Sequence, residues 1–254
     1  MRMSGQTATV HPESGVGDRT YGEVLQLDTL LTMQESIADV PDTLFFIAAH
    51  QITELWFMVT LHELELARSA MDADDLREAC YRLRRVARIE DVLVAQLPVL
   101  ETLSPRHFAA IRKRLGASSG FQSAQFREIE FFSGLKEPQY LSQVDVSPAE
   151  RRRLERRLSE PSLADAFEGV LQRRGRPDLT AVTDQNTDGE LQDLIEGLLD
   201  LDEGLARWRA RHALMVERII GYKPGTGGSD GVAYLHSTTG KRFFPRLWQI
   251  RSAL

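Results

Sequence analysis

The sequence predicts an all-α protein, an antiparallel helical bundle with its functional loops at one end. Apolar residues recur three and four positions apart over long stretches, alternating β-branched runs typical of strands are absent, and serine, proline and glycine mark where helices begin and end. The chain has 254 residues, 42% of them hydrophobic, which is enough for one domain with its own core. Its net charge of −6 argues against nucleic acid as a partner.

The N-terminal part of the chain differs in composition from the rest. The first eighteen residues are polar, so we expect a flexible arm over 1–18 and a single domain over 19–254. We find no apolar leader and no long apolar span, which favours a cytoplasmic protein that binds no membrane. The single cysteine, Cys80, excludes an intrachain disulfide and lies in a helical pattern.

Four helices are predicted in the first half of the chain, over the ranges 21–33, 43–70, 75–103 and 105–115. Leucines at helical spacing indicate the first, and Pro41-Asp42 is the start signal of the second. An aspartate at 74 or 75 caps the third. Ser104-Pro105 begins the fourth helix, which Gly116 ends.

The second half of the chain predicts further helices over 121–135, from Ser147-Pro148, from Ser162 and over 190–220. Glycine, proline and asparagine indicate a loop over 174–189, and we expect the last helix to break near Asp202. The tail after it is glycine-rich and then aromatic. Arginines within 151–157 alternate with glutamates, which is typical of the solvated face of a helix rather than of a nucleic-acid patch.

The helix over 43–70 carries polar residues in a nearly continuous apolar run. Spacing of four places Phe46, His50 and Glu54 on one face. Buried polar groups need hydrogen-bond partners, so this face predicts either a cavity or a hydrogen-bonded core histidine. For a lone histidine the second interpretation is the commoner one.

His212 lies on the apolar stripe of the last long helix. A buried imidazole in a bundle can be a haem ligand, although alone it is more often a hydrogen-bonded core residue. A di-iron bundle requires Glu-x-x-His pairs, and none of His50, His62, His107 and His212 has a glutamate three residues before it. One axial histidine and a second pocket histidine are therefore a simpler hypothesis than a two-carboxylate iron site.

Two further features carry polar groups suited to a ligand. Arg112 shares a face with Phe108 and Ile111, and an arginine on an apolar stripe either extends to solvent or pairs with a carboxylate. The segment 225–231 holds four glycines, whose backbone N–H groups can approach an anion closely. No Gly-Lys-Ser/Thr follows, so it is not a phosphate loop, and a flexible turn is the alternative.

Taken in order, these segments resemble the tryptophan 2,3-dioxygenase family, from Tyr21 to about Trp248. The resemblance rests on the following residues: Tyr21-Gly22 with Leu25-Gln26-Leu27, His50-Gln51 with Glu54-Leu55-Trp56, Leu100-Glu101-Thr102-Leu103 leading to Arg112, Ser118-Ser119-Gly120-Phe121-Gln122-Ser123, and Gly225-Thr226-Gly227-Gly228. The last two segments are specific to that family.

The resemblance implies an all-helical haem b enzyme that uses O2 to oxidise the indole of L-tryptophan to N-formylkynurenine, as a homo-oligomer, a tetramer or a dimer. It implies that His212 is the proximal haem ligand and that His50 lies on the distal side near the indole N–H. It also implies a set of substrate-binding residues: Arg112 for the carboxylate, Thr226 for the amino-acid head, Phe46 and Phe108 as pocket walls, Ser119 and Gly120 at the haem edge, and Tyr21 and Leu25 in a segment that reaches a neighbouring subunit's pocket.

The chain also departs from the family pattern. Val24 replaces a tyrosine, 38–42 lacks a His-His-Asp-Glu run, the region 165–195 is shortened, and 229–231 reads Ser-Asp-Gly. Two alternatives follow. One is a haem-dependent monooxygenase of tryptophan or β-methyltryptophan that gives an oxindole-type product in natural-product biosynthesis. The other is a non-catalytic haem-binding or sensor protein, against which the retained amino-acid-binding residues argue.

Overall fold

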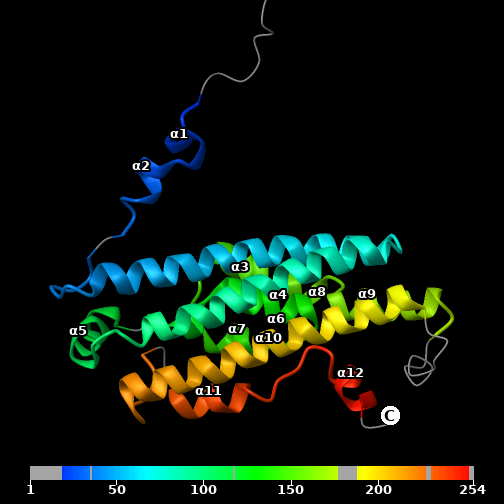
Figure 1. Ribbon diagram of the computed structural model, residues 1–254. Coiled ribbons are helices and arrows are strands. Elements are labelled where there is room, and N and C mark those ends of the chain that lie inside the picture. The colour runs from blue at the N-terminus through cyan, green and yellow to red at the C-terminus, as the bar shows by residue number, and fades with distance from the viewer. Residues whose placement is uncertain (1–18, 35, 117, 177–187, 227–229, 252–254) are drawn as a thin grey trace, which may run out of the picture. The chain divides into compact units, whose positions relative to one another are not determined.

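The structure is a computed structural model that describes residues 19–34, 36–116, 118–176, 188–226 and 230–251. Within them every regular element is a helix, which confirms the predicted all-α class (Figure 1). In chain order the elements are α1 Tyr21–Leu25, α2 Leu27–Leu30, α3 Thr43–Asp72, α4 Leu76–Leu100, α5 Pro105–Leu115, the 3-10 helix η1 Gly120–Gln122, α6 Ala124–Ser133, α7 Tyr140–Gln143, α8 Pro148–Ser159, α9 Leu163–Arg173, α10 Gly189–Ile220, α11 Val232–Thr238 and α12 Pro245–Ile250.

The chain divides into two compact units, residues 1–35 and 36–254. In the first unit, the single helix predicted over 21–33 is two short helices, because Gln26 adopts a left-handed conformation with φ 52°. Neither helix buries a residue. The predicted arm 1–18 lies outside the described residues, so the predicted domain limits stay a prediction.

Three long helices, α3, α4 and α10, form the frame of the second unit (Figure 1). A tight turn reverses the chain after α3, and the Asp75 carboxylate caps α4 by accepting from Glu78 N at 3.0 Å. The helix α10 packs on α4 and runs in the same direction, because α5 to α9 carry the chain back first. The bundle is therefore not wholly antiparallel, contrary to the prediction.

The predicted break in the last long helix is wrong, since α10 is continuous through Asp202. The Asp202 side chain is fully buried, yet its carboxylate accepts from Phe243 N at 3.0 Å, Phe244 N at 3.1 Å and Trp248 Nε1 at 3.0 Å. A buried carboxylate with several donors is stabilised in place. The helix therefore needs no break, and the aromatic tail packs against it.

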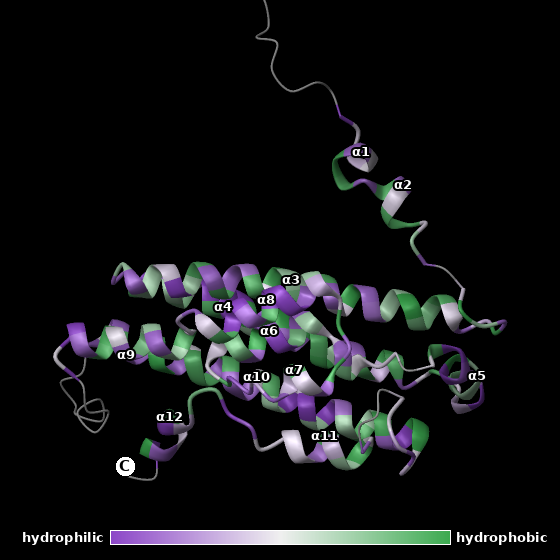
Figure 2. Cartoon of the chain, turned by 180° about the vertical axis from the view of Figure 1, so that it is seen from behind, coloured by the Kyte–Doolittle hydropathy of each residue, from purple (hydrophilic) through white to green (hydrophobic). Residues whose placement is uncertain are grey.

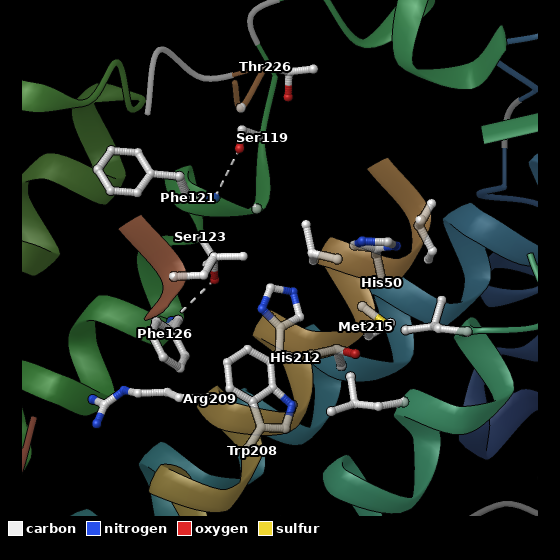
Figure 3. A pocket seen from close by; sticks show the side chains of 18 of the residues that line it. His50, Ser119, Phe121, Ser123, Phe126, Trp208, Arg209, His212, Met215 and Thr226 are labelled. Carbon is white, nitrogen blue, oxygen red and sulfur yellow. Dashed lines mark hydrogen bonds between the residues drawn. The ribbon is translucent and has the colours of Figure 1, made fainter. Parts of the chain in front are cut away.

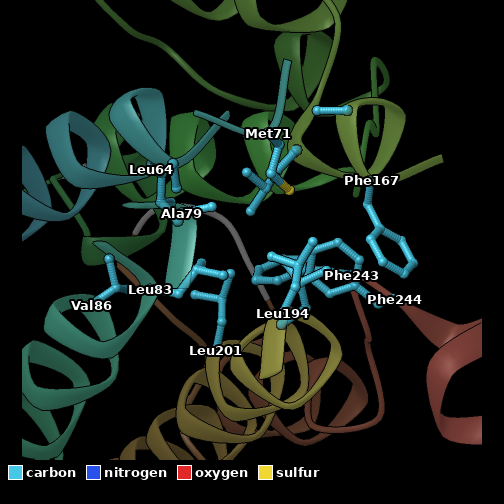
Figure 4. Packing of buried hydrophobic residues seen from close by; sticks show 14 of the residues in the cluster. Leu64, Met71, Ala79, Leu83, Val86, Phe167, Leu194, Leu201, Phe243 and Phe244 are labelled. Carbon is cyan, nitrogen blue, oxygen red and sulfur yellow. The ribbon is translucent and has the colours of Figure 1, made fainter. Parts of the chain in front are cut away.

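The largest apolar core lies in the half of the bundle that contains the end of α3 and the beginnings of α4 and α10 (Figure 4). Leu64, Leu83 and Leu194 are fully buried there, with Phe243 and Phe244 of the tail. Figure 2 shows hydrophobic and hydrophilic residues in periodic bands along the helices, as amphipathic helices require.

The arginine-rich helix α8 is not simply a solvated face, so that prediction is wrong for Arg157. Its side chain is buried and contacts three carboxylates: Glu128 at 3.3 Å, Glu160 at 2.7 Å and Glu65. Its guanidinium also lies 4.9 Å from the centre of the Phe132 ring. A buried cation needs such partners, and they join α8 to α3 and α6.

Among the described residues, α3 is the one helix long and apolar enough to cross a membrane, contrary to the expectation of no such span. Length and composition alone carry that finding, and the core helix of a soluble protein passes the same test. Here α3 packs along α4, α6 and α9. Cytoplasmic location stays a prediction.

A two-histidine cavity as the candidate functional site

A cavity of about 270 Å³ opens at the end of the bundle where α3 begins and α4 and α10 end. In addition to these three helices, α5, the loop before α6 and α11 line it. Figure 3 shows the His50 and His212 rings turned toward the same space from α3 and α10. The cavity therefore brings together two imidazoles that are far apart in the sequence.

His50 is held in one tautomer by its own helix. Its Nδ1 lies 2.7 Å from the carbonyl oxygen of Phe46, one turn earlier. A carbonyl oxygen only accepts, so Nδ1 carries the proton and Nε2 keeps a lone pair in the neutral ring. His50 lines the cavity. Burial lowers the pKa of His50, while the Phe46 bond and the charge of Glu54 oppose that shift. His50 is therefore a neutral acceptor at neutral pH.

His212 has no hydrogen-bond partner among the described residues. Its ring stacks on Trp208, with centroids 4.9 Å apart and planes 7° apart. Burial, and then the nearby His50, lower the pKa of His212 to about 4. The imidazole is thus neutral at physiological pH and offers a free nitrogen to the cavity, which is what a metal ligand requires. The interpretation of His212 as a hydrogen-bonded core residue is wrong.

Arg112 and Thr226 lie at the mouth of the cavity and contact backbone carbonyls. The Arg112 guanidinium donates to the carbonyl oxygen of Pro224, and Thr226 Oγ1 donates to the carbonyl oxygen of Ser118 at 2.7 Å. Arg112 is half-buried, so it does not extend freely to solvent, and it pairs with no carboxylate among the described residues. Both donors are held by uncharged acceptors that an anionic ligand can replace.

The glycine-rich segment is described only in part, since residues 227–229 lie outside the described residues. Its end requires glycine: Gly231 has φ 64°, and a Cβ there would lie 2.4 Å from the Lys223 carbonyl oxygen and 3.1 Å from Gly225 N. No side chain fits such an approach. Gly231 therefore packs directly against the backbone of 223–225, the residues that precede Thr226.

Ser119 and Gly120 line the cavity from a short, internally bonded loop. Ser119 Oγ accepts from Phe121 N at 3.3 Å, and Ser119 N donates to the Gln122 side chain at 3.1 Å. On the opposite side, the rings of Phe46 and Phe108 lie 5.8 Å apart and form an aromatic corner. A planar apolar ligand fits between such walls.

The structure brings eight of the predicted site residues to this one cavity: Phe46, His50, Phe108, Arg112, Ser119, Gly120, His212 and Thr226. Tyr21 and Leu25 belong to the first unit, where their side chains are 77% and 44% exposed. Among the described residues there is no group of three His, Cys, Asp or Glu side chains that could hold a metal ion, so a site made wholly of protein ligands is not found there.

Sequence reasoning gave no site role to several lining residues, among them Trp208, Phe126 and Tyr234. The sequence could have identified Trp208 as a site residue, because it precedes His212 by four residues on the same helical stripe. The sequence does not identify Tyr234 as a site residue, since α11 has only seven residues and periodicity does not reveal so short a helix.

The fold and site define a class of all-helical protein with a cavity suited to an aromatic ligand or a cofactor. A protein imidazole on the cavity wall is available to bind that ligand. The family model of tryptophan 2,3-dioxygenase matches residues 3–176 and 173–254. A tryptophan 2,3-dioxygenase of a Nocardioides species is 47% identical over 252 residues, which cover 92% of this chain and 94% of that relative. The Herpetosiphon aurantiacus enzyme is 43% identical over 92% of this chain and 98% of its own. The Caulobacter vibrioides enzyme is 40% identical, over 93% and 99%.

The chain therefore belongs to the tryptophan 2,3-dioxygenase family, whose members are oxidoreductases that incorporate molecular oxygen. This confirms the resemblance drawn from the sequence.

Proposed function

We propose that the protein is a haem-dependent dioxygenase that uses O2 to oxidise the indole ring of L-tryptophan to N-formylkynurenine. The observation that carries this proposal is the single cavity in which His50 and His212 meet, with Arg112 and Thr226 at its mouth. The names of the relatives support the same activity.

The residues of the cavity fit haem b. His212 presents a neutral imidazole with no hydrogen-bond partner among the described residues, on a wall that is otherwise mostly aliphatic and aromatic. His212 is therefore the residue that would hold the iron. Bound haem supplies the iron centre at which O2 is activated. Trp208, stacked on His212, fixes the plane of the imidazole.

His50 is suited to bind the substrate rather than the iron. Because Nδ1 donates to the Phe46 carbonyl, the free Nε2 can accept a hydrogen bond from the indole N–H. The Phe46 and Phe108 rings supply apolar walls for the indole. Together these three residues orient the ring that reacts, which is much of what a protein adds to the chemistry of its cofactor.

The mouth of the cavity is suited to the amino-acid head of tryptophan. Its carboxylate is a stronger acceptor than the Pro224 carbonyl that Arg112 binds in this structure. Thr226 provides a hydroxyl beside it, and Ser119 and Gly120 border the same space. The described residues offer no feature that favours the monooxygenase or the sensor alternative.

The N-terminal unit supports a proposal of homo-oligomerisation, as a tetramer or a dimer. Tyr21, Val24 and Leu31 are more than half exposed within this chain, although all three are apolar. Exposed apolar side chains on and next to two short helices indicate a contact surface. We propose that Tyr21 and Leu25 line the cavity of a second copy, and light scattering showing a fully active monomer would contradict this.

The decisive experiment counts oxygen atoms. Haem-loaded protein is given L-tryptophan and ¹⁸O2 under reducing conditions, and the product is weighed by mass spectrometry. N-formylkynurenine with two ¹⁸O atoms is expected. A product with one ¹⁸O atom would establish the monooxygenase alternative, and no product with intact haem would establish the sensor alternative.

The role of Arg112 has its own test. A hydrogen bond to a charged group contributes about 1.5–3 kcal/mol, so Arg112→Ala should raise the KM for tryptophan by roughly one to two orders of magnitude. Its neighbour Lys113 is exposed on the same helix, and Lys113→Ala should leave the KM unchanged. Equal affinity of the wild type for tryptophan and for an indole without a carboxylate would contradict the assignment.

A further inference from the structure

Glu54 lines the cavity but takes no part in the binding of haem or tryptophan proposed above. It lies on α3 one turn after His50, and both of its carboxylate oxygens accept hydrogen bonds. Ser123 Oγ donates to one at 2.7 Å, and Gln125 Nε2 donates to the other at 2.8 Å and to the backbone oxygen of Glu54 at 2.9 Å. Three hydrogen bonds therefore join α3 to the beginning of α6, and bonds to a carboxylate are the stronger kind.

Ser123 connects this carboxylate to the helix that follows. A hydroxyl has one hydrogen, and here it goes to Glu54, so the Ser123 oxygen is left to accept from Phe126 N at 3.2 Å. The same oxygen thus caps α6. Because the carboxylate orients the hydroxyl, Glu54 fixes both the conformation of Ser123 and the start of α6.

Hydrogen bonds within the loop that ends at Ser123 hold its residues together. We call residues 118–123 the Ser118–Ser123 loop. Inside it, Ser119 and Gln122 bond each other through their side chains and backbones. Its first residue accepts from Thr226 at 2.7 Å, and Phe121 O accepts from Tyr140 at 2.8 Å. The loop therefore contacts the rest of the protein at a few defined points, of which Glu54 is the one on the helix of His50.

We propose that Glu54 is a positioning residue that holds the Ser118–Ser123 loop at a fixed distance from His50 and thereby sets the affinity of the cavity for tryptophan. The inference rests on the proposed function. His50 and Glu54 share one rigid helix, so the bond to Ser123 fixes the loop relative to the His50 imidazole. When that bond is lost, the loop must be ordered again by each substrate, which weakens binding.

The variant Glu54→Gln tests this in the haem-loaded full chain. The amide keeps the shape of the carboxylate but removes the charge, and whichever way it turns, one of the two oxygens that accept from Ser123 and Gln125 is replaced by a donor. Losing a charge-assisted hydrogen bond typically changes an equilibrium about tenfold or more, so KM for L-tryptophan should rise about tenfold while kcat stays within about twofold.

Glu63 offers a matched control on the same helix. It is buried, and its two oxygens contact Arg85 at 2.7 Å and Arg82 at 3.3 Å, away from the cavity. Glu63→Gln should lower stability and leave KM unchanged. An unchanged KM in Glu54→Gln, or an equal rise in both variants, would overturn the proposal, because the effect would then be absent or general.

A coupling measurement shows whether Glu54 acts through Ser123. Residues in one hydrogen-bond network show non-additive effects, whereas independent residues add. KM in the double variant Glu54→Gln/Ser123→Ala should be no higher than in Glu54→Gln alone. Additive rises would overturn the proposed route.

Hydrogen exchange gives a readout that does not depend on activity. In haem-loaded protein without tryptophan, the amides of 118–126 should exchange faster in Glu54→Gln than in the wild type or in Glu63→Gln. This result would stand even if the wild type formed no N-formylkynurenine, so the proposed function and the positioning role fail separately. Equal exchange in all three proteins would overturn the positioning role.

Discussion

The two halves of the bundle use the same three helices in opposite ways. In one half, the end of α3 and the beginnings of α4 and α10 meet in a closed core around Leu64, Leu83 and Leu194 (Figure 4). In the other half, the beginning of α3 and the ends of α4 and α10 surround the cavity, with His50 and His212 on its walls (Figure 3). The closed half holds the largest buried apolar cluster, and the open half contains the cavity.

The difference shows why a histidine of the open half can be left without a hydrogen-bond partner. Asp202, which lies in the closed half, finds its partners in the backbone of the tail. His212 lies on the same helix but faces the space where the packing ends, and no described residue forms a hydrogen bond with its ring. One end of α10 therefore packs in the closed core, and the other end presents the His212 imidazole to the cavity.

The largest effect is expected for His212→Ala. Because His212 is the residue that would hold haem, the variant should lose the Soret band almost completely. The folding stability of the haem-free protein should change little, since the removed ring faces open space. Haem titration and urea unfolding check the two parts, and full haem retention would contradict the assignment.

A matched pair of leucine truncations compares the two halves directly. Leu194 is fully buried in the closed core, so Leu194→Ala should lower the free energy of unfolding by about 2–5 kcal/mol. Leu97 is also buried, but its side chain borders the cavity. Leu97→Ala should cost less, because the neighbouring walls can relax into existing space. Equal losses in urea unfolding of the haem-free proteins would contradict the distinction.

The contact between α4 and α10 is so close that only glycine fits at Gly204. A Cβ there would lie 2.0 Å from Oε2 of Glu90, a buried carboxyl group whose pKa burial raises well above its usual range. Gly204→Ala should cost about 1–3 kcal/mol by overpacking. On the same helix Gly189 has nothing within 4 Å of its Cβ position, so Gly189→Ala is the control and should be neutral or stabilising.

The smallest effect concerns pH. The pKa of His212 is about 4 in the folded protein, below the value of about 6.5 expected when it is unfolded. Between these values the unfolded chain binds the extra proton, so the stability of the haem-free protein falls as pH drops from 6.5 toward 4. His212→Asn should make that fall shallower in urea unfolding measured from pH 7 to pH 5. An unchanged slope would show that His212 is not a low-pKa group.

Local patterns were sufficient to predict most helices. Ser104-Pro105 and Gly116 bound α5 at the predicted residues, and Asp75 caps α4 as expected. The prediction was wrong where a residue's partner is distant in the sequence. Asp202 was expected to break α10, because a buried aspartate without a partner is unfavourable. Its partner, the backbone N–H of Phe243, lies in the tail, and no local pattern identifies it. Arg157 was placed in solvent because its partner Glu128 is on another helix.

The sequence by itself determined the helical class, the helix starts and the residue types of the site, because helical periodicity and capping depend on neighbours a few positions apart. It also determined the family, since the Ser118–Ser123 segment and the glycine-rich segment are specific. Only the tertiary structure decided that His50 and His212 face one cavity and that Glu54 bonds Ser123. Those outcomes depend on where the closed core ends and on which helices meet there, which no local pattern records.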